Sequence, residues 1–168
     1  MSAIIAYFSR CGENYVSGAI LNLKVGNTEI IAEMLHNLIG AELFKLEPVQ
    51  EYSWNYNECI AQAQADQRRD ARPELKAYPE NVEKYDTIYL GFPNYWGTMP
   101  MCMFTFLERY DFTGKVIKPF CTHEGIGFGN SIADIKRLCP TAIVQPGFDV
   151  RGAAVKKAEA ALKKWSKS

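Results

Sequence analysis

Short apolar runs alternate with helical patterns along the whole chain, and this alternation restricts the possible folds more than any other feature. The runs that suit strands are 3–8, 41–46, 87–92, 116–121 and 142–150, the last of which is interrupted by Pro146-Gly147. The helical patterns lie at 28–39, 56–69, 101–110, 131–138 and 153–165. Crossovers between parallel strands are right-handed and place helices on both faces of a sheet. We therefore predict an α/β fold with a five-stranded parallel sheet between two helical layers.

The helices carry recognisable start and stop signals. Asn27 is the expected N-cap of the first helix, and Gly40 follows its last periodic residue. Asn55 or Asn57 is expected to cap the second helix. These signals place short loops directly after the strands. Sheets of this kind bind ligands beyond the carboxyl ends of their strands, so these loops are where function is expected.

The loop after the first strand has the chemistry of a phosphate site in two separate halves. Ser9-Arg10-Cys11-Gly12 follows the strand, and Gly26-Asn27-Thr28 opens the first helix. Hydroxyl, amide and guanidinium groups donate hydrogen bonds, and a helix N-terminus attracts anions. Between the halves, apolar and polar residues alternate over 21–25 after Ser17-Gly18, which predicts a small hairpin. The alternative is that Asn27 and Thr28 only cap a helix and Ser9-Arg10 forms an ordinary turn.

Two further loops combine aromatic residues and glycines. Pro93-Asn94-Tyr95-Trp96-Gly97-Thr98 follows the third strand, and its adjacent Tyr and Trp suit either core packing or stacking on a planar ligand. The segment 122–131, THEGIGFGNS, follows the fourth strand, and its alternate glycines permit close approach of the backbone to a ligand. Within it, His123 and Glu124 are either an acid–base pair or a solvated pair.

Other aromatic and charged residues leave alternatives open. Tyr52, Trp54 and Tyr56 follow the second strand and either wall one side of a pocket or pack the second helix onto the sheet. Arg68, Arg69 and Arg72 are expected to form a solvated face, and His36 a surface position. No spacing matches a nucleophile elbow or a metal site, so no catalytic residue and no metal ligand are predicted.

Composition excludes several classes of protein. The 168 residues are 48% apolar and 23% charged, which predicts one globular domain over 1–168. Lys and Arg number 19, as do Asp and Glu, so charge gives no reason to expect nucleic acid or an anionic membrane as partner. The five cysteines are widely spaced, which favours unbridged thiols and a cytoplasmic location. Cys102 and Cys121 are expected to be buried, and Cys11 lies in a polar loop.

In combination, the three loops resemble the flavodoxin superfamily, and more narrowly the small flavodoxin-like branch whose phosphate loop is split by an excursion. The residues that carry the resemblance are YFSR…GNTE (7–10 and 26–29), GFPNYWGTMP (91–100), TFLERYDFTGK (105–115) and PFCTHEGIGFGNS (119–131). The resemblance covers essentially the whole chain. It implies a flavodoxin-like three-layer sandwich with the strand order 2-1-3-4-5.

The resemblance also implies one non-covalent FMN. Its phosphate would lie at Ser9, Arg10, Asn27 and Thr28, with Asn14 assisting. Its isoalloxazine would lie between 93–98, with Tyr95 or Trp96 against it, and 122–129. The residues implied to bind the cofactor are Ser9, Arg10, Asn14, Asn27, Thr28, Pro93, Asn94, Tyr95, Trp96, Gly97, Thr122, His123, Glu124, Gly125, Gly127 and Gly129. Cys11 stands where a hydroxyl residue is common in the family.

We expect an FMN-binding redox protein that transfers electrons to a partner protein or a small-molecule acceptor. The alternative is an FMN-dependent NAD(P)H oxidoreductase that reduces a quinone or similar acceptor, with His123 or a tyrosine as proton donor. A third possibility is a module that keeps the fold without flavin and acts through protein contacts. Zero net charge differs from the strongly acidic flavodoxins that shuttle electrons.

Overall fold

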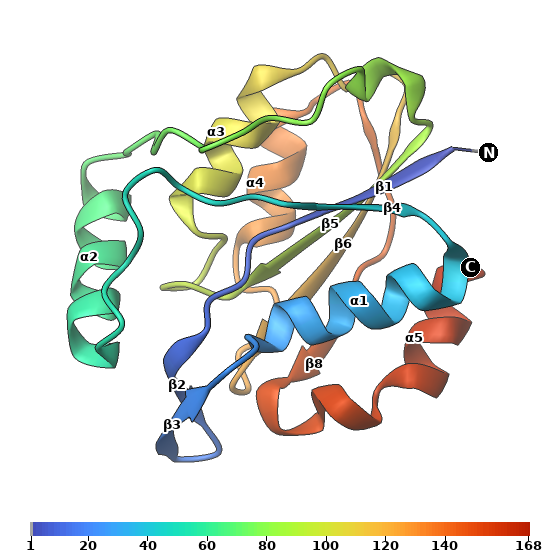
Figure 1. Ribbon diagram of the computed structural model, residues 1–168. Coiled ribbons are helices and arrows are strands. Elements are labelled where there is room, and N and C mark those ends of the chain that lie inside the picture. The colour runs from blue at the N-terminus through green and yellow to red at the C-terminus, as the bar shows by residue number, and fades with distance from the viewer. Residues whose placement is uncertain (1) are drawn as a thin grey trace.

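A computed structural model describes residues 2–168, and its centre is a twisted parallel sheet (Figure 1). The strands are β1 (Ala3–Tyr7), β4 (Glu42–Lys45), β5 (Thr87–Pro93), β6 (Val116–His123), β7 (Ile143–Val144) and β8 (Phe148–Arg151). Their order is β4-β1-β5-β6-β7, and β8 also pairs with β6 in parallel. Pro146-Gly147 lies between β7 and β8, as the sequence predicted, because proline cannot donate a ladder hydrogen bond. With β7 and β8 taken as one interrupted strand, the order is the expected 2-1-3-4-5.

Helices cover both faces of the sheet. They are α1 (Asn27–Ile39), α2 (Tyr56–Arg68), α3 (Met101–Arg109), α4 (Ser131–Leu138) and α5 (Glu159–Ser166), with 3₁₀ turns η1 (Val82–Lys84) and η2 (Gly152–Lys157). Figure 1 shows α1 and α5 on one face, and α3 and α4 on the other. The result is the three-layer flavodoxin-like sandwich predicted from the sequence.

The core consists of two clusters separated by the sheet. Side chains of β1 alternate between them: Ile4 and Ala6 pack toward α3 and α4, and Ile5 and Tyr7 pack toward α1 and α5. This alternation is the period of a strand, and burial on both faces explains why β1 is apolar throughout.

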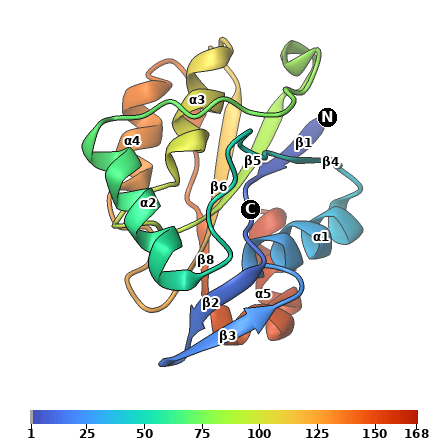
Figure 2. The same ribbon diagram turned by 60° about the vertical axis from the view of Figure 1, so that its left-hand side comes forward.

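The antiparallel hairpin β2 (Gly12–Val16) and β3 (Ala19–Leu23) follows β1 and stands apart from the central sheet (Figure 2). Its turn residues Ser17 and Gly18 have φ of 49° and 85°. Two consecutive positive φ angles give the turn type that matches the twist of a two-residue hairpin. The predicted excursion is therefore a hairpin, and it separates the two halves of the proposed phosphate loop in sequence.

Several predicted boundaries were wrong. Asn27 is the first residue of α1, and the N-cap position is Gly26, without a side-chain cap. Ser9 takes the capping role from the neighbouring strand end, because its Oγ accepts the Glu29 N–H at 3.0 Å. β6 continues two residues beyond the predicted 116–121, since the added pairing with β8 extends its ladder. The closing helix begins as η2 and becomes α-helical only at Glu159.

Candidate functional site

A cavity of about 320 Å³ opens at the carboxyl edge of the sheet, beyond the ends of β1, β5 and β6. The hairpin and α2 form its outer walls. Its lining residues are Ser9, Arg10, Asn14, Tyr15, Asn27, Thr28, Tyr56, Cys59, Ile60, Ala63, Pro93, Asn94, Tyr95, Trp96, Thr122, His123, Glu124 and Ile126. Every residue in the sequence-predicted set lies among them except Gly97, Gly125, Gly127 and Gly129. Those glycines shape the loops without lining the cavity.

The two halves of the proposed phosphate loop meet at Gly26. An ideal Cβ on this residue would lie 2.2 Å from Ser9 Oγ and 2.6 Å from the Arg10 carbonyl oxygen. Only glycine fits at position 26, because any side chain would collide with the end of β1. Its φ of −66° is ordinary, so the backbone conformation does not itself require glycine. The contact places the first amides of α1 beside the end of β1. Helix N-termini leave their first N–H groups unpaired within the helix, which makes this corner suited to an anion.

Side chains around this corner are anchored by the surrounding elements. Thr28 Oγ1 and Thr122 Oγ1 lie 2.8 Å apart and are both buried, which ties α1 to the end of β6. Asn14 Nδ2 donates to the carbonyls of Arg10 and Gly12, each at 3.1 Å. The Asn14 amide therefore also stabilises the backbone between β1 and the hairpin.

Arg10 lines the cavity, and its terminal nitrogens are bonded to backbone carbonyls. Nη1 donates to Glu13, and Nη2 donates to Ser53 and to Trp54, each at 2.7 Å. Its Nε is buried and has no hydrogen-bond partner within residues 2–168. Burial raises the pKa of the nearby Cys59 thiol, while the positive charge of Arg10 acts in the opposite direction.

The two aromatic residues of the loop after β5, Tyr95 and Trp96, lie in different surroundings. Tyr95 packs edge-on against Phe8 and Tyr52, with ring centroids 5.8 and 6.0 Å away. Burial raises the pKa of the Tyr95 hydroxyl well above its ordinary value. Trp96 is 47% exposed, and its indole N–H donates to the Ile60 carbonyl of α2 at 2.8 Å. Both residues line the cavity, but Tyr95 also packs against the core, whereas Trp96 is half exposed.

Trp96 holds an unfavourable backbone conformation. Tyr95 and Thr98 exchange backbone hydrogen bonds, and the residues between them, Trp96 and Gly97, have φ of 53° and 85°. Left-handed φ is uncommon for a bulky residue and costs about 1–2 kcal/mol. Asp134 stabilises the turn by accepting the Thr98 hydroxyl at 2.5 Å. A strained residue at a cavity wall is typical of functional positions.

His123 and Glu124 do not pair with each other. The Gly125 N–H donates to His123 Nδ1 at 2.8 Å, so Nε2 carries the proton and donates to Asp149 at 2.7 Å. The Glu124 carboxylate accepts the Ser17 N–H at the hairpin tip, also at 2.7 Å. The predicted alternative of an acid–base pair was therefore wrong, because β8 supplies a different partner to the histidine.

One face of α2 forms a wall of which the sequence suggested only Tyr56. Tyr56, Cys59, Ile60 and Ala63 are spaced as one helical stripe and all line the cavity. Of the three aromatic residues left open before α2, Tyr56 lines the cavity, Tyr52 packs in the core and Trp54 is 57% exposed. The stripe was visible in the sequence, but periodicity does not tell what a face covers.

A family model described as flavodoxin matches residues 3–168. The chain belongs to the flavodoxin family. No curated protein matches it. A candidate flavoprotein from Bacteroides uniformis shares the fold with a TM-score of 0.77 and 23% identity, covering 99% of this chain and 98% of that one. One from Bacteroides eggerthii has a TM-score of 0.71 and 24% identity, covering 96% and 97%. A flavoprotein from Lactobacillus acidophilus, solved in complex with FMN, has a TM-score of 0.67 and 17% identity, covering 93% and 97%.

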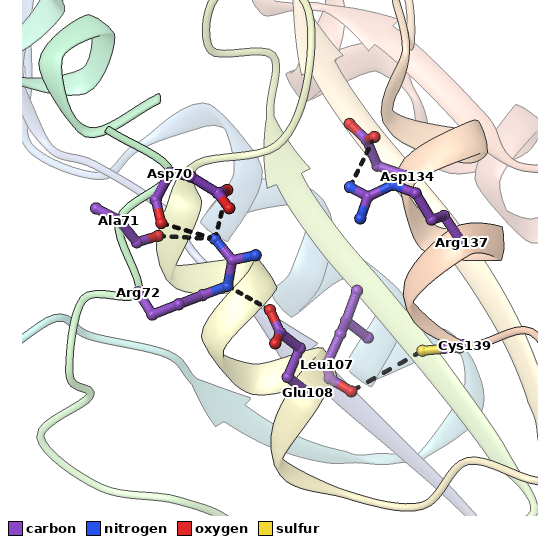
Figure 3. A network of polar contacts seen from close by, with 8 residues as sticks. All are labelled: Asp70, Ala71, Arg72, Leu107, Glu108, Asp134, Arg137 and Cys139. Carbon is purple, nitrogen blue, oxygen red and sulfur yellow. Dashed lines mark hydrogen bonds and ion pairs between the residues drawn. The ribbon is translucent and has the colours of Figure 1, made fainter. Parts of the chain in front are cut away.

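The arginines after α2 of this flavodoxin are bonded and not simply solvated. Figure 3 shows Arg72 donating to Glu108 of α3 and to Asp70, which is 2.7 Å away. Arg69 pairs with Asp66, also at 2.7 Å. The predicted solvated face was therefore wrong for Arg72, which ties the segment after α2 to α3.

None of the helices within residues 2–168 combines the length and apolar character that crossing a membrane requires.

The cysteines of this flavodoxin differ sharply in accessibility. Cys11 is exposed, whereas Cys59, Cys102, Cys121 and Cys139 are buried. Burial raises the pKa of Cys102 to about 12 and that of Cys139 to about 11, so both stay protonated at pH 8.

We expect a disulfide reagent at pH 8 to label the Cys11 thiol rapidly and the four buried thiols only on unfolding. Cys11→Ser should abolish the rapid phase, and a rapid phase that survives would contradict this assignment.

Proposed function

We propose that this flavodoxin binds one non-covalent FMN in the cavity and transfers electrons through it. The observation that carries the proposal is one continuous cavity with a helix N-terminus at one end and aromatic walls at the other. A dianionic phosphate needs the first environment, and a planar apolar ring system needs the second. The Lactobacillus acidophilus flavoprotein that shares the fold was solved with FMN, which supports the same ligand here.

The residues present fit FMN. At the phosphate end, Ser9, Asn27 and Thr28 line the cavity beside the first amides of α1, and Gly26 allows the end of β1 to approach them closely. When bound, FMN supplies reversible electron transfer, and the protein supplies its binding and surroundings.

Electron transfer is favoured over proton-coupled catalysis by the state of the acid–base side chains. Both ring nitrogens of His123 are engaged, with Asp149 and with the Gly125 N–H. Glu124 accepts the Ser17 N–H. The proton on His123 Nε2 is already donated to Asp149, which argues against the histidine as a proton donor to the flavin or its substrate.

A second candidate function is supported by the apolar mouth of the cavity. Tyr15, Trp96 and Ile126 line it and are 44%, 47% and 65% exposed. Exposed apolar groups around a cavity are typical of binding surfaces. They would suit a flat apolar acceptor such as a quinone, reduced at the expense of NAD(P)H.

Titration of the flavin-free protein with FMN tests the proposal. We expect quenching of flavin fluorescence at one FMN per chain. The loaded protein is then mixed anaerobically with NADH and with NADPH, and we expect the flavin absorption to persist. Rapid bleaching by either nucleotide would favour the quinone reductase. A protein that stays colourless after incubation with FMN would contradict both functions.

A further inference from the structure

The guanidinium of Arg10 connects two segments that lie outside the central sheet. Its acceptors are Glu13, at the base of the hairpin, and Ser53 with Trp54, directly before α2. The same segments share a backbone bond from the Glu13 N–H to the Trp54 carbonyl at 3.3 Å. Arg10 therefore lies at a seam between two peripheral elements.

These two elements are the outer walls of the cavity. The hairpin contributes Tyr15 and α2 contributes Tyr56, and their ring centroids are 6.0 Å apart. The Trp54 indole lies against Gly12, where an ideal Cβ would be 2.9 Å from it. The hydrogen bonds of Arg10 thus fix the position of the hairpin relative to α2.

The bonding of Arg10 differs from that of an arginine held in an ion pair. Within residues 2–168, no carboxylate lies within ion-pair distance of it, whereas Arg69 and Arg137 each have one and Arg72 has two. Three carbonyls from two segments surround its terminal nitrogens instead. A planar guanidinium can bridge such divergent acceptors, whereas the single ammonium of lysine cannot reach them all.

We propose that Arg10 is a positioning residue that ties the hairpin to the segment before α2 and so fixes the separation of the two walls at the width that admits the flavin ring. This role replaces the phosphate contact that the sequence suggested, and it rests on the proposed FMN site. A residue that contacts the phosphate would affect the binding of FMN but not that of riboflavin, which lacks the phosphate. A residue that sets the spacing of the walls affects the binding of the isoalloxazine ring, which FMN and riboflavin share.

The affinities of FMN and riboflavin separate the two roles. We expect Arg10→Ala to weaken both by the same factor, about tenfold or more, because several charge-assisted hydrogen bonds are lost. Arg10→Lys keeps the positive charge but should not restore either affinity. Arg69→Ala, which removes an exposed guanidinium from the end of α2, is the matched control and should match the wild type. A loss confined to FMN, or rescue of FMN binding by lysine, would overturn the proposal.

Hydrogen exchange of the flavin-free protein gives a readout that needs no ligand. In Arg10→Ala and Arg10→Lys, we expect faster exchange at 12–16 and 54–63, and unchanged exchange in α1. Unchanged exchange in both walls would overturn the proposal, as would global unfolding of both variants, because a peripheral seam should not control the core. If the wild type binds neither flavin, the proposed function fails, while the exchange data still decide whether Arg10 holds the walls.

Discussion

Gly26→Ala is expected to lower FMN affinity about 100-fold, equivalent to about 2.7 kcal/mol. The added methyl would lie 2.2 Å from Ser9 Oγ and 2.6 Å from the Arg10 carbonyl, so the end of β1 and the start of α1 must separate. Because one of these neighbours is backbone, the clash cannot be relieved by a side-chain rotation. Overpacking of this kind also lowers the free energy of unfolding, by about 1–3 kcal/mol.

Gly40→Ala is the matched control for this variant. Gly40 ends the same helix with φ of 71°, and no atom lies within 4 Å of its ideal Cβ. The substitution should therefore cost about 1 kcal/mol through left-handed strain alone and leave FMN affinity unchanged. Fluorescence titration and chemical denaturation of both variants check the comparison. Wild-type affinity in Gly26→Ala would mean that the two loop halves do not form one phosphate site.

Trp96→Ala is expected to weaken FMN binding by about 1–3 kcal/mol, the effect of losing one aromatic stack. Tyr95→Ala should mainly lower the free energy of unfolding, because Tyr95 packs against Phe8 and Tyr52. Trp96→Gly should lose the same flavin affinity as Trp96→Ala yet unfold less easily, since glycine accepts the φ of 53° without strain.

Isothermal titration with FMN and urea denaturation of the three variants measure these effects. The difference in stability between Trp96→Gly and Trp96→Ala should be about 1 kcal/mol. Equal stability would show that the turn carries no strain at this position. Flavin affinity unchanged in both Trp96→Ala and Tyr95→Ala would remove the loop after β5 from the site.

Local sequence signals were enough to predict the fold and the edge of the sheet where the cavity lies. Alternating runs fixed the order of strands and helices, since burial on both faces leaves a strand such as β1 apolar throughout. Ser17-Gly18 marked the hairpin turn, and Pro146-Gly147 marked the break in the last strand. Each of these signals is local, because it depends on the backbone preferences of neighbouring residues.

The contacts that hold the cavity walls became visible only in the folded chain. Arg10 contacts Ser53 and Trp54, and His123 contacts Asp149, across separations that no local pattern encodes. The apolar stripe of α2 was readable, but whether it faces core or cavity depends on where the helix packs. Hydrogen bonds between distant segments are chosen by the geometry of the folded chain, and sequence neighbours such as His123 and Glu124 are then directed to different partners.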